Sequence, residues 1–436
     1  MIIDVKKTGG DFNTIRAGIA AANPGDTVRI HDGVYHEDQV TVNTPNVSII
    51  GVGDVVIDGR AGVGGINNGY PSGDLQYASS TGKSFVWGKL LNIMADNVAL
   101  KNVKITRSMG RGLAVGADVN KPVHDVLIED VIIDVTRNAG LLATGAVGLV
   151  LRNVEVSGTA DIISGTATAK NHAGGLTLKG CKDTIVDGCV VHDNWGEGLM
   201  VDTNWGGSDG WVVRNCDVYN NGWLNFYVHA TQNGKIQNCR IYETPDFNPE
   251  HNLRIGAGLG LHVNPIESVS YAKGSRTLTN HIEIDGVHIE NAGIVFGRSS
   301  ASTNFRLSNI SVKNSNLVNP KRDAFAVSEF PLLSEFLDNV IILNGGTFTG
   351  NSGNFSRLAR DGNTYSEFPG GGIMSGSDSV DSSPVLYDIT GASGIPVDPP
   401  IEPPVDPPIE PPDPERIPIT GYMEKDSEGT VLVLRW

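Results

Sequence analysis

Four titratable residues recur at one position of a repeated pattern between residues 176 and 262. Lys179, Asp202, His229 and His262 end the short apolar alternations LTLK, LMVD, FYVH and LGLH. Side chains alternate between the two faces of a strand, so the apolar residues should face one way and these four the other. Strands stacked in register lie about 4.8 Å apart. The sequence therefore predicts one outward column in which an ammonium group, a carboxylate and two imidazoles have coupled titrations.

This column contains the groups that acid–base catalysis needs. A lyase acting on a uronic acid chain must neutralise the substrate carboxylate, remove the proton beside it and protonate the leaving oxygen. Cations and imidazoles serve the first two tasks, and a tyrosine phenol serves the third. Asp202 should stay ionised between Lys179 and His229, which leaves His262 as the predicted general base. Arg298 is expected at the end of the column, one residue out of register. The predicted catalytic residues are Lys179, Asp202, His229, His262, Tyr227 and Arg298.

Tryptophans gather in the same stretch. Trp195, Trp205, Trp211 and Trp223 are four of the six in the chain. Exposed aromatic faces mark binding surfaces, and they stack on sugar rings. A glycan site is therefore favoured over an inert polar face, with the alternative that some of these rings pack inside turns. The predicted substrate-binding residues are Trp195, Trp205, Trp223, Asn225 and Glu197.

A metal site is the weaker interpretation of the acidic residues nearby. Asp193, Glu197 and Asp209 carry the hard oxygen ligands that Ca²⁺ prefers. Asp in such loops more often forms turns, so no cofactor is predicted and calcium remains the open alternative. A cysteine metal site is not expected, because the chain has no CxxC pair.

The repeats themselves indicate the fold. Cys189, Cys216 and Cys239 open equivalent segments, 27 and 23 residues apart. Each repeat holds three short alternations rich in Val and Ile, which is typical of strands and excludes a helical repeat. We therefore predict an all-β chain, a single-stranded parallel β-helix. The three cysteines should form a buried ladder of free thiols, because their parallel side chains at about 4.8 Å do not suit a disulfide.

A small residue precedes the third strand of each predicted coil. The residues one and three places later are apolar and should face the interior. The small residues are expected at an inward bend, where their side chains would stack. They are Asn102, Asp130, Asn153, Gly188, Asn215, Asn238, Gly286, Asn309 and Asn339.

Composition limits the partners. The chain has 436 residues and a net charge of −16, which argues against nucleic acid as the main partner. It has no apolar run long enough for a membrane span, and its first residues lack the layout of a signal peptide.

The N-terminal segment carries a family resemblance. Residues 11–22 predict a short capping helix that ends at Asn23-Pro24-Gly25, and the segments GDTV, GVY and VIDG follow. These features and the coils resemble the right-handed parallel β-helix superfamily, which includes pectate-lyase-like enzymes and phage tail proteins. The resemblance covers roughly residues 8–350 and implies the fold more strongly than an activity. The chain lacks the paired-aspartate signature of polygalacturonases and the Asp-Pro-His signature of mannuronan epimerases.

We predict five segments along the chain. Residues 1–58 form the cap and first coils, 59–350 the β-helix body and 351–394 an irregular Gly/Ser-rich segment. Residues 395–416 form an acidic proline-rich linker, and 417–436 a β-hairpin that could dock on a partner. A homotrimer is a further expectation from the resemblance to phage tail proteins.

The predicted function is binding and cleavage of an acidic polysaccharide, outside the cell or on a virion, by a β-eliminating lyase. Two alternatives remain open at this point. One is a non-catalytic phage tail adhesin, and the other is a glycoside hydrolase, which needs two carboxylates at a set separation.

Overall fold

The computed structural model describes residues 1–37, 39–59, 88–108, 110–159, 174–202, 207–229, 231–247, 257–263 and 278–298, and strand segments at 306–313, 315–318, 323–327, 332–337, 340–342, 347–349, 364–366, 423–425 and 430–432. Beyond residue 247 the description of side chains is confined to residues 279, 281–292 and 315. The predicted insertions at 60–87 and 160–173 lie outside the described residues.

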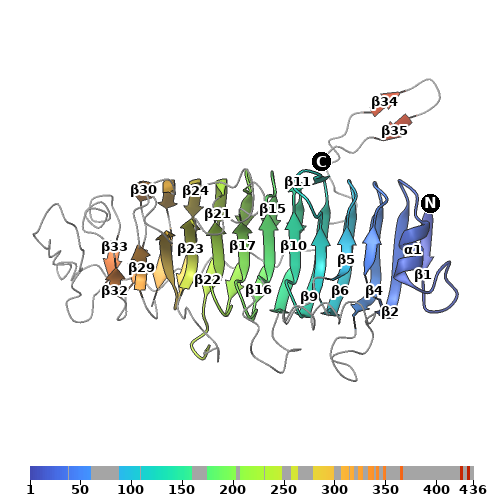
Figure 1. The fold of residues 1–436 in the computed structure, drawn as a ribbon, viewed down its shortest axis with the longest axis horizontal. Helices are drawn as coiled ribbons and strands as arrows, with labels where there is room; N and C mark the ends of the chain where they lie inside the picture. The colour runs from blue at the N-terminus through green and yellow to red at the C-terminus, as the bar shows by residue number, and fades with distance from the viewer. Residues whose placement is uncertain are drawn as a thin grey trace, which may run out of the picture. The chain divides into compact units, whose positions relative to one another are not determined.

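The chain winds into a stack of parallel coils, as the period-two pattern predicted (Figure 1). Each complete coil adds one strand to an 11-stranded sheet, here called the small sheet, and the rest to a 20-stranded sheet, called the large sheet. Within the described residues both sheets are parallel throughout, because every strand pairs with the equivalent strands of the coils before and after it. The fold is therefore an all-β parallel β-helix.

The small sheet carries the predicted site. Its strands are β3 (Val40–Val42), β5 (Lys89–Ile93), β7 (Arg111–Val115), β10 (Leu141–Thr144), β14 (Leu176–Lys179), β17 (Leu199–Asp202), β20 (Phe226–His229), β23 (Ala257–Val263), β26 (Gly293–Arg298), β29 (Asp323–Val327) and β32 (Thr347–Thr349).

The large sheet supplies the other faces of each coil. Its strands are β1 (Ile2–Val5), β2 (Thr27–His36), β4 (Ser48–Asp58), β6 (Ala99–Ser108), β9 (Leu127–Thr136), β12 (Val150–Arg152), β13 (Glu155–Thr159), β15 (Ile185–Asp187), β16 (Val190–His192), β18 (Val212–Arg214), β19 (Asp217–Tyr219), β21 (Gln232–Gln237), β22 (Arg240–Tyr242), β24 (Leu278–Asp285), β25 (His288–Glu290), β27 (Arg306–Lys313), β28 (Asn316–Val318), β30 (Leu332–Leu337), β31 (Val340–Ile342) and β33 (Thr364–Ser366). A short parallel pair, β8 (Val123–His124) and β11 (Ala146–Val147), lies beside it.

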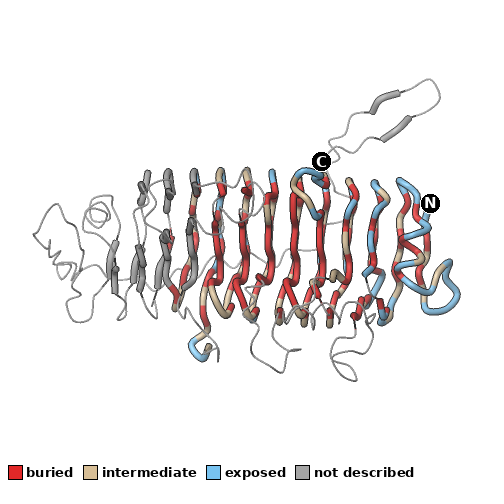
Figure 2. Tube along the Cα trace, viewed as in Figure 1, coloured by how far each residue is buried: buried red, intermediate tan, exposed pale blue. Residues whose placement is uncertain are grey.

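The interior is a continuous apolar column, which appears in Figure 2 as the red buried stretches shared by successive coils. The predicted inward positions are confirmed: Val218 and Ile241, for example, have no exposed surface. The predicted cysteine ladder is also present, with Cys189, Cys216 and Cys239 buried and free. The contact with the neighbouring thiol raises the pKa of Cys216 and of Cys239, and the loss of solvent raises it further.

The column of small residues before the third strands does not face the interior, so that expectation was wrong. Asn102, Asn153, Asn215 and Asn238 are exposed. In the members of the column from Asn102 to Gly286, φ lies between 51° and 64°, the left-handed region. Asn, Asp and Gly recur there because they adopt this turn conformation at the lowest cost, not because their side chains stack inside.

A buried asparagine ladder exists elsewhere, at the turn that leads into the small sheet. The side-chain amide of Asn194 donates to Asn221 Oδ1 at 2.9 Å, and that of Asn221 donates to Asn225 Oδ1 at 3.0 Å. All three are at most 2% exposed. They hydrogen-bond backbone groups of neighbouring coils, such as the carbonyl of Val191, that would otherwise be buried without a partner.

The predicted capping helix is α1 (Ile15–Ala21). Thr14 caps its first turn by accepting from the Ala17 amide at 3.3 Å, and Glu37 Oε1 accepts from the Ile15 amide at 2.6 Å. Ile15 and Ile19 are buried against the first coils. The helix therefore covers apolar core that the first coil would leave exposed.

Residues 392–436 form a second compact unit, separate from residues 1–391. Its described strands are β34 (Met423–Lys425) and β35 (Thr430–Leu432), which pair in antiparallel fashion. The docking role of this unit stays a prediction, as do the five predicted segment boundaries.

Candidate active site on the small sheet

The small sheet holds the predicted titratable residues in one register. Lys179 pairs with Asp202, and His229 pairs with His262 on the next strand. Leu199 pairs with Phe226, which places Asp202 beside His229. Arg298 pairs with Val263, one position past His262, as the sequence predicted. The side chains of His262 and Arg298 lie outside the described part of the chain, so the predicted roles of these two residues stay predictions.

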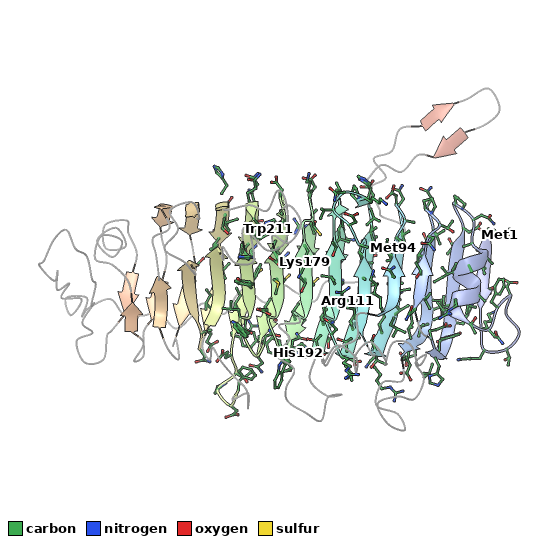
Figure 3. The ribbon with its side chains drawn as sticks, viewed as in Figure 1. Met1, Met94, Arg111, Lys179, His192 and Trp211 are labelled. Carbon is green, nitrogen blue, oxygen red and sulfur yellow. The ribbon has the colours of Figure 1, made fainter. Side chains whose placement is uncertain are left out.

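Three of the side chains are in contact and are here called the Lys–Asp–His cluster. Asp202 Oδ2 lies 3.6 Å from Lys179 Nζ, and Asp202 Oδ1 lies 2.8 Å from His229 Nδ1. A carboxylate at this distance holds the proton of the neutral imidazole on Nδ1 and leaves the lone pair on Nε2. The cluster therefore combines a cation, an orienting carboxylate and a basic nitrogen within two strand spacings. Figure 3 labels Lys179 in the green middle of the stack.

Two residues of the outward column, Asp202 and His229, are buried, which alternation alone did not predict. The side chain of Asp202 is 7% exposed and that of His229 0%, whereas Lys179 retains 27%. An apolar cluster adjoins them through Tyr227, whose ring stacks on His229. Met200, Leu224 and Tyr227 are buried against one another, with Trp223 packed beside them. Alternation within a strand predicts the face to which a side chain points, but it does not predict which other side chains pack on that face.

Tyr227 contacts the cluster directly. Its ring stacks on the imidazole of His229, with centroids 5.5 Å apart and an interplanar angle of 9°. The two residues belong to one strand, β20, and point to the same face. Tyr227 therefore lies where both a ring contact with substrate and a phenolic proton are available near His229.

The predicted binding residues do not all reach this surface. Asn225 is fully buried and belongs to the asparagine ladder, and its role in binding substrate stays a prediction. Trp211 is fully buried too, and its indole nitrogen donates to Thr231 Oγ1 at 2.6 Å. Trp195 is half-buried at the turn before β17, and Trp223 borders the apolar cluster.

Glu197 and Trp205 complete the predicted set. Glu197 is 6% exposed and lies two residues before β17, and its role in binding substrate stays a prediction. Trp205 lies outside the described residues.

The three predicted calcium ligands do not converge. Asp193 is exposed and lies 2.7 Å from His192 Nδ1. Asp209 accepts from Gln232 and Asn233 at 2.7 and 2.8 Å, in the turn before β18. Among the residues with described side chains, no group of three or more His, Cys, Asp or Glu could hold a metal ion.

Two features were missed from the sequence. His192, Tyr219 and Tyr242 stack on the outer face of the large sheet, with ring centroids 4.8 and 4.7 Å apart. Their equivalent positions in successive third strands were a usable signal. Lys89 and Arg111 lie opposite one another in β5 and β7 of the small sheet. This second pair lies in coils that precede the three similar repeats, so the repeated pattern did not reveal it.

Comparison with known proteins agrees with the fold. Residues 91–247 match the family described as right handed beta helix region. No curated protein matches the sequence. This match covers about a third of the chain and agrees with the coils that the structure shows there.

Three solved structures illustrate what the chain is similar to. A rhamnogalacturonan lyase is 12% identical with a TM-score of 0.50, over 73% of this chain and 82% of that one. The polygalacturonase of Erwinia carotovora is 11% identical with a TM-score of 0.47, over 86% and 96%. A protein of Geobacillus virus E2 is 11% identical with a TM-score of 0.46, over 79% of this chain and 61% of that one. At these identities the likeness shows the fold alone. No helix in the described ranges is long and apolar enough to cross a membrane.

Proposed function

We propose that the protein binds an acidic polysaccharide on the outer face of the small sheet and cleaves it by β-elimination at the Lys–Asp–His cluster. The observation that supports this most is the placement of Asp202 between Lys179 and His229, at 3.6 and 2.8 Å. A buried carboxylate that orients an imidazole beside a cation is an arrangement suited to proton abstraction.

Each residue has a distinct role in this proposal. Lys179, the most exposed of the three, pairs with the carboxylate of a uronic acid residue. His229 Nε2 takes the proton from the carbon that bears this carboxylate, and Asp202 stabilises the imidazolium that forms. The electrons of the broken C–H bond form a double bond to the neighbouring carbon. The C–O bond at that carbon breaks, and Tyr227 protonates the leaving oxygen.

His229 replaces His262 as the proposed base, because its imidazole contacts the orienting carboxylate. His229 has no exposed surface in the free protein. Its Nε2 therefore becomes reachable only when neighbouring side chains move, and the stacked ring of Tyr227 is the first that must shift.

The test is direct. The protein is incubated with polygalacturonate, polymannuronate, polyguluronate and bacterial capsular polysaccharides, while ultraviolet absorbance follows the new double bond and chromatography follows chain length. His229→Ala and Asp202→Asn should lower turnover by orders of magnitude. His192→Ala is the matched control, because His192 also touches a carboxylate but lies on the large sheet. Full turnover in both cluster variants on a cleaved substrate would place the chemistry elsewhere.

The burial of the cluster favours a second candidate, a non-catalytic glycan-binding protein of a virion or cell surface. A buried ion pair can hold two strands together without reacting, and Trp223 with Tyr227 would then supply the binding face. In that case no polysaccharide in the panel is shortened, and binding depends on Trp223. A hydrolase is less well supported, because the Lys–Asp–His cluster contains one carboxylate and hydrolysis uses two.

A further inference from the structure

A pair of cations lies on the small sheet upstream of the Lys–Asp–His cluster. Lys89 opens β5 and Arg111 opens β7, and the two residues are register partners in adjacent parallel strands. The ammonium group of Lys89 reaches the side chain of Asn92, at 3.3 Å from its Oδ1. Figure 3 labels Arg111 on the N-terminal side of Lys179. Two like charges are thus held about one strand spacing apart in a chain whose net charge is −16.

Both cations are partly withdrawn from water. Burial lowers the pKa of Lys89, and the neighbouring charge of Arg111 lowers it further. Burial also lowers the pKa of Arg111, to about 10. Two partly buried like charges on adjacent strands repel one another, and together they create a local positive potential that attracts an anion.

Several other lysines have carboxylate partners in the described part of the chain. On the large sheet Lys101 lies 2.6 Å from Glu129, and Lys104 lies 2.7 Å from Asp134. Lys89, in contrast, forms no ion pair with any residue whose side chain is described. What distinguishes Lys89 is its partial burial beside a second cation, Arg111.

The position of the pair relates it to the proposed reaction. Strands β5, β7, β10 and β14 are consecutive in the small sheet, so Lys89 lies three strand spacings from Lys179. At about 4.8 Å each this is roughly 14 Å along the stack. The register places Lys89 level with Gly174, five residues before Lys179, so the two residues are also offset by roughly 16 Å along the strand direction. A single sugar unit cannot contact both cations, but an oligosaccharide that crosses the sheet diagonally can.

We propose that Lys89 and Arg111 form a subsite for the carboxylate of a uronic acid residue several units away from the bond that is broken. This inference rests on the proposed function, because it takes the acidic chain at the Lys–Asp–His cluster as its ligand. An arginine can hold a carboxylate through two parallel hydrogen bonds, and a lysine adds a point charge beside it. A sulfate ester offers similar oxygens, so the experiment must separate the two.

The experiment measures dissociation constants by calorimetry on the full chain. The probes are hexamers and dimers of galacturonate, mannuronate and guluronate, the fully methyl-esterified galacturonate hexamer, and a sulfated galactan hexamer. Lys89→Met and Arg111→Gln should each weaken binding of a uronate hexamer by about tenfold or more. They should leave the dimer and the methyl ester unchanged. Lys101→Met removes the same charge from the large sheet and serves as the matched control.

A change in hexamer binding can be attributed to the subsite only if the variant remains folded. Lys89→Met removes one of two repelling charges and should not lower the melting temperature of the free protein. If Lys89→Met binds the uronate hexamer as well as the native chain does, the subsite is refuted, whatever the protein cleaves. A loss seen only with the sulfated hexamer overturns the assignment to a uronate. If hexamer binding weakens as expected while no chain is cleaved, the subsite stands and the proposed lyase reaction fails.

Discussion

Replacing His229 with alanine tests whether the Lys–Asp–His cluster supports the fold as well as the proposed reaction. The imidazole is fully buried and its Nδ1 lies 2.8 Å from Asp202. Loss of a hydrogen bond to a charged group costs about 1.5–3 kcal/mol. The cavity left by a buried ring adds to this, although Asp202 keeps Lys179 at 3.6 Å and does not become an isolated buried charge. We therefore expect a loss of about 3 kcal/mol in the free energy of unfolding, with turnover abolished.

Urea unfolding followed by circular dichroism measures this loss of stability. A double-mutant cycle shows how much of it comes from the contact between His229 and Asp202. His229→Ala, Asp202→Asn and the double variant should show a coupling energy of about 1–3 kcal/mol, because the two side chains touch. His192→Ala is again the control, since His192 is partly exposed and should cost much less. Unchanged stability in His229→Ala, or a coupling energy near zero, would refute the buried contact and with it the proposed orientation of the imidazole.

Four further outcomes are expected. Val218→Asp buries a charge in the interior and should cost several kcal/mol, so an unchanged melting temperature would contradict the register. Asn221→Leu removes the centre of the buried asparagine ladder and leaves several polar groups without partners, so it should cost about 3 kcal/mol or more in urea unfolding. Asp193 raises the pKa of His192 above its ordinary 6.5 in the folded state. The stabilisation from this pair should be full below that unfolded value and disappear as pH rises through the raised one, and a stability difference between the native chain and His192→Phe that does not vary with pH would contradict it. Deleting residues 392–436 should leave the melting transition of the β-helix and any glycan activity intact, whereas loss of folding would show that this unit covers the solenoid.

The fold could be predicted because the interior imposes a strict rule on the sequence. Every inward position of a coil must be apolar and must stack on the same position of the next coil, so residues such as Val191, Val218 and Ile241 align by eye. The register of Lys179, Asp202 and His229 followed from that rule alone. It required only that outward residues alternate with inward ones.

The rest depends on information that period-two alternation does not carry. Alternation placed His229 on the outer face but did not predict its burial, to which the stacked ring of Tyr227 contributes. The fate of Asn225 depends on a hydrogen bond to Asn221, four residues earlier in a turn. The exposed asparagines, such as Asn215, were misassigned because two demands select the same residue type: a left-handed φ and a buried amide. Sequence spacing did not distinguish them.

The buried thiol ladder has a consequence for how opening of the stack can be observed. Cys189, Cys216 and Cys239 lie in three successive coils, and each is at most 1% exposed. Because they are buried, we expect a thiol reagent to reach one of them only after its coil has parted from a neighbour. Because adjacent coils hold one another through nearest-neighbour contacts, separation at one point weakens only the coils on either side. The order in which the three sulfurs are alkylated would therefore report the direction in which the solenoid unravels.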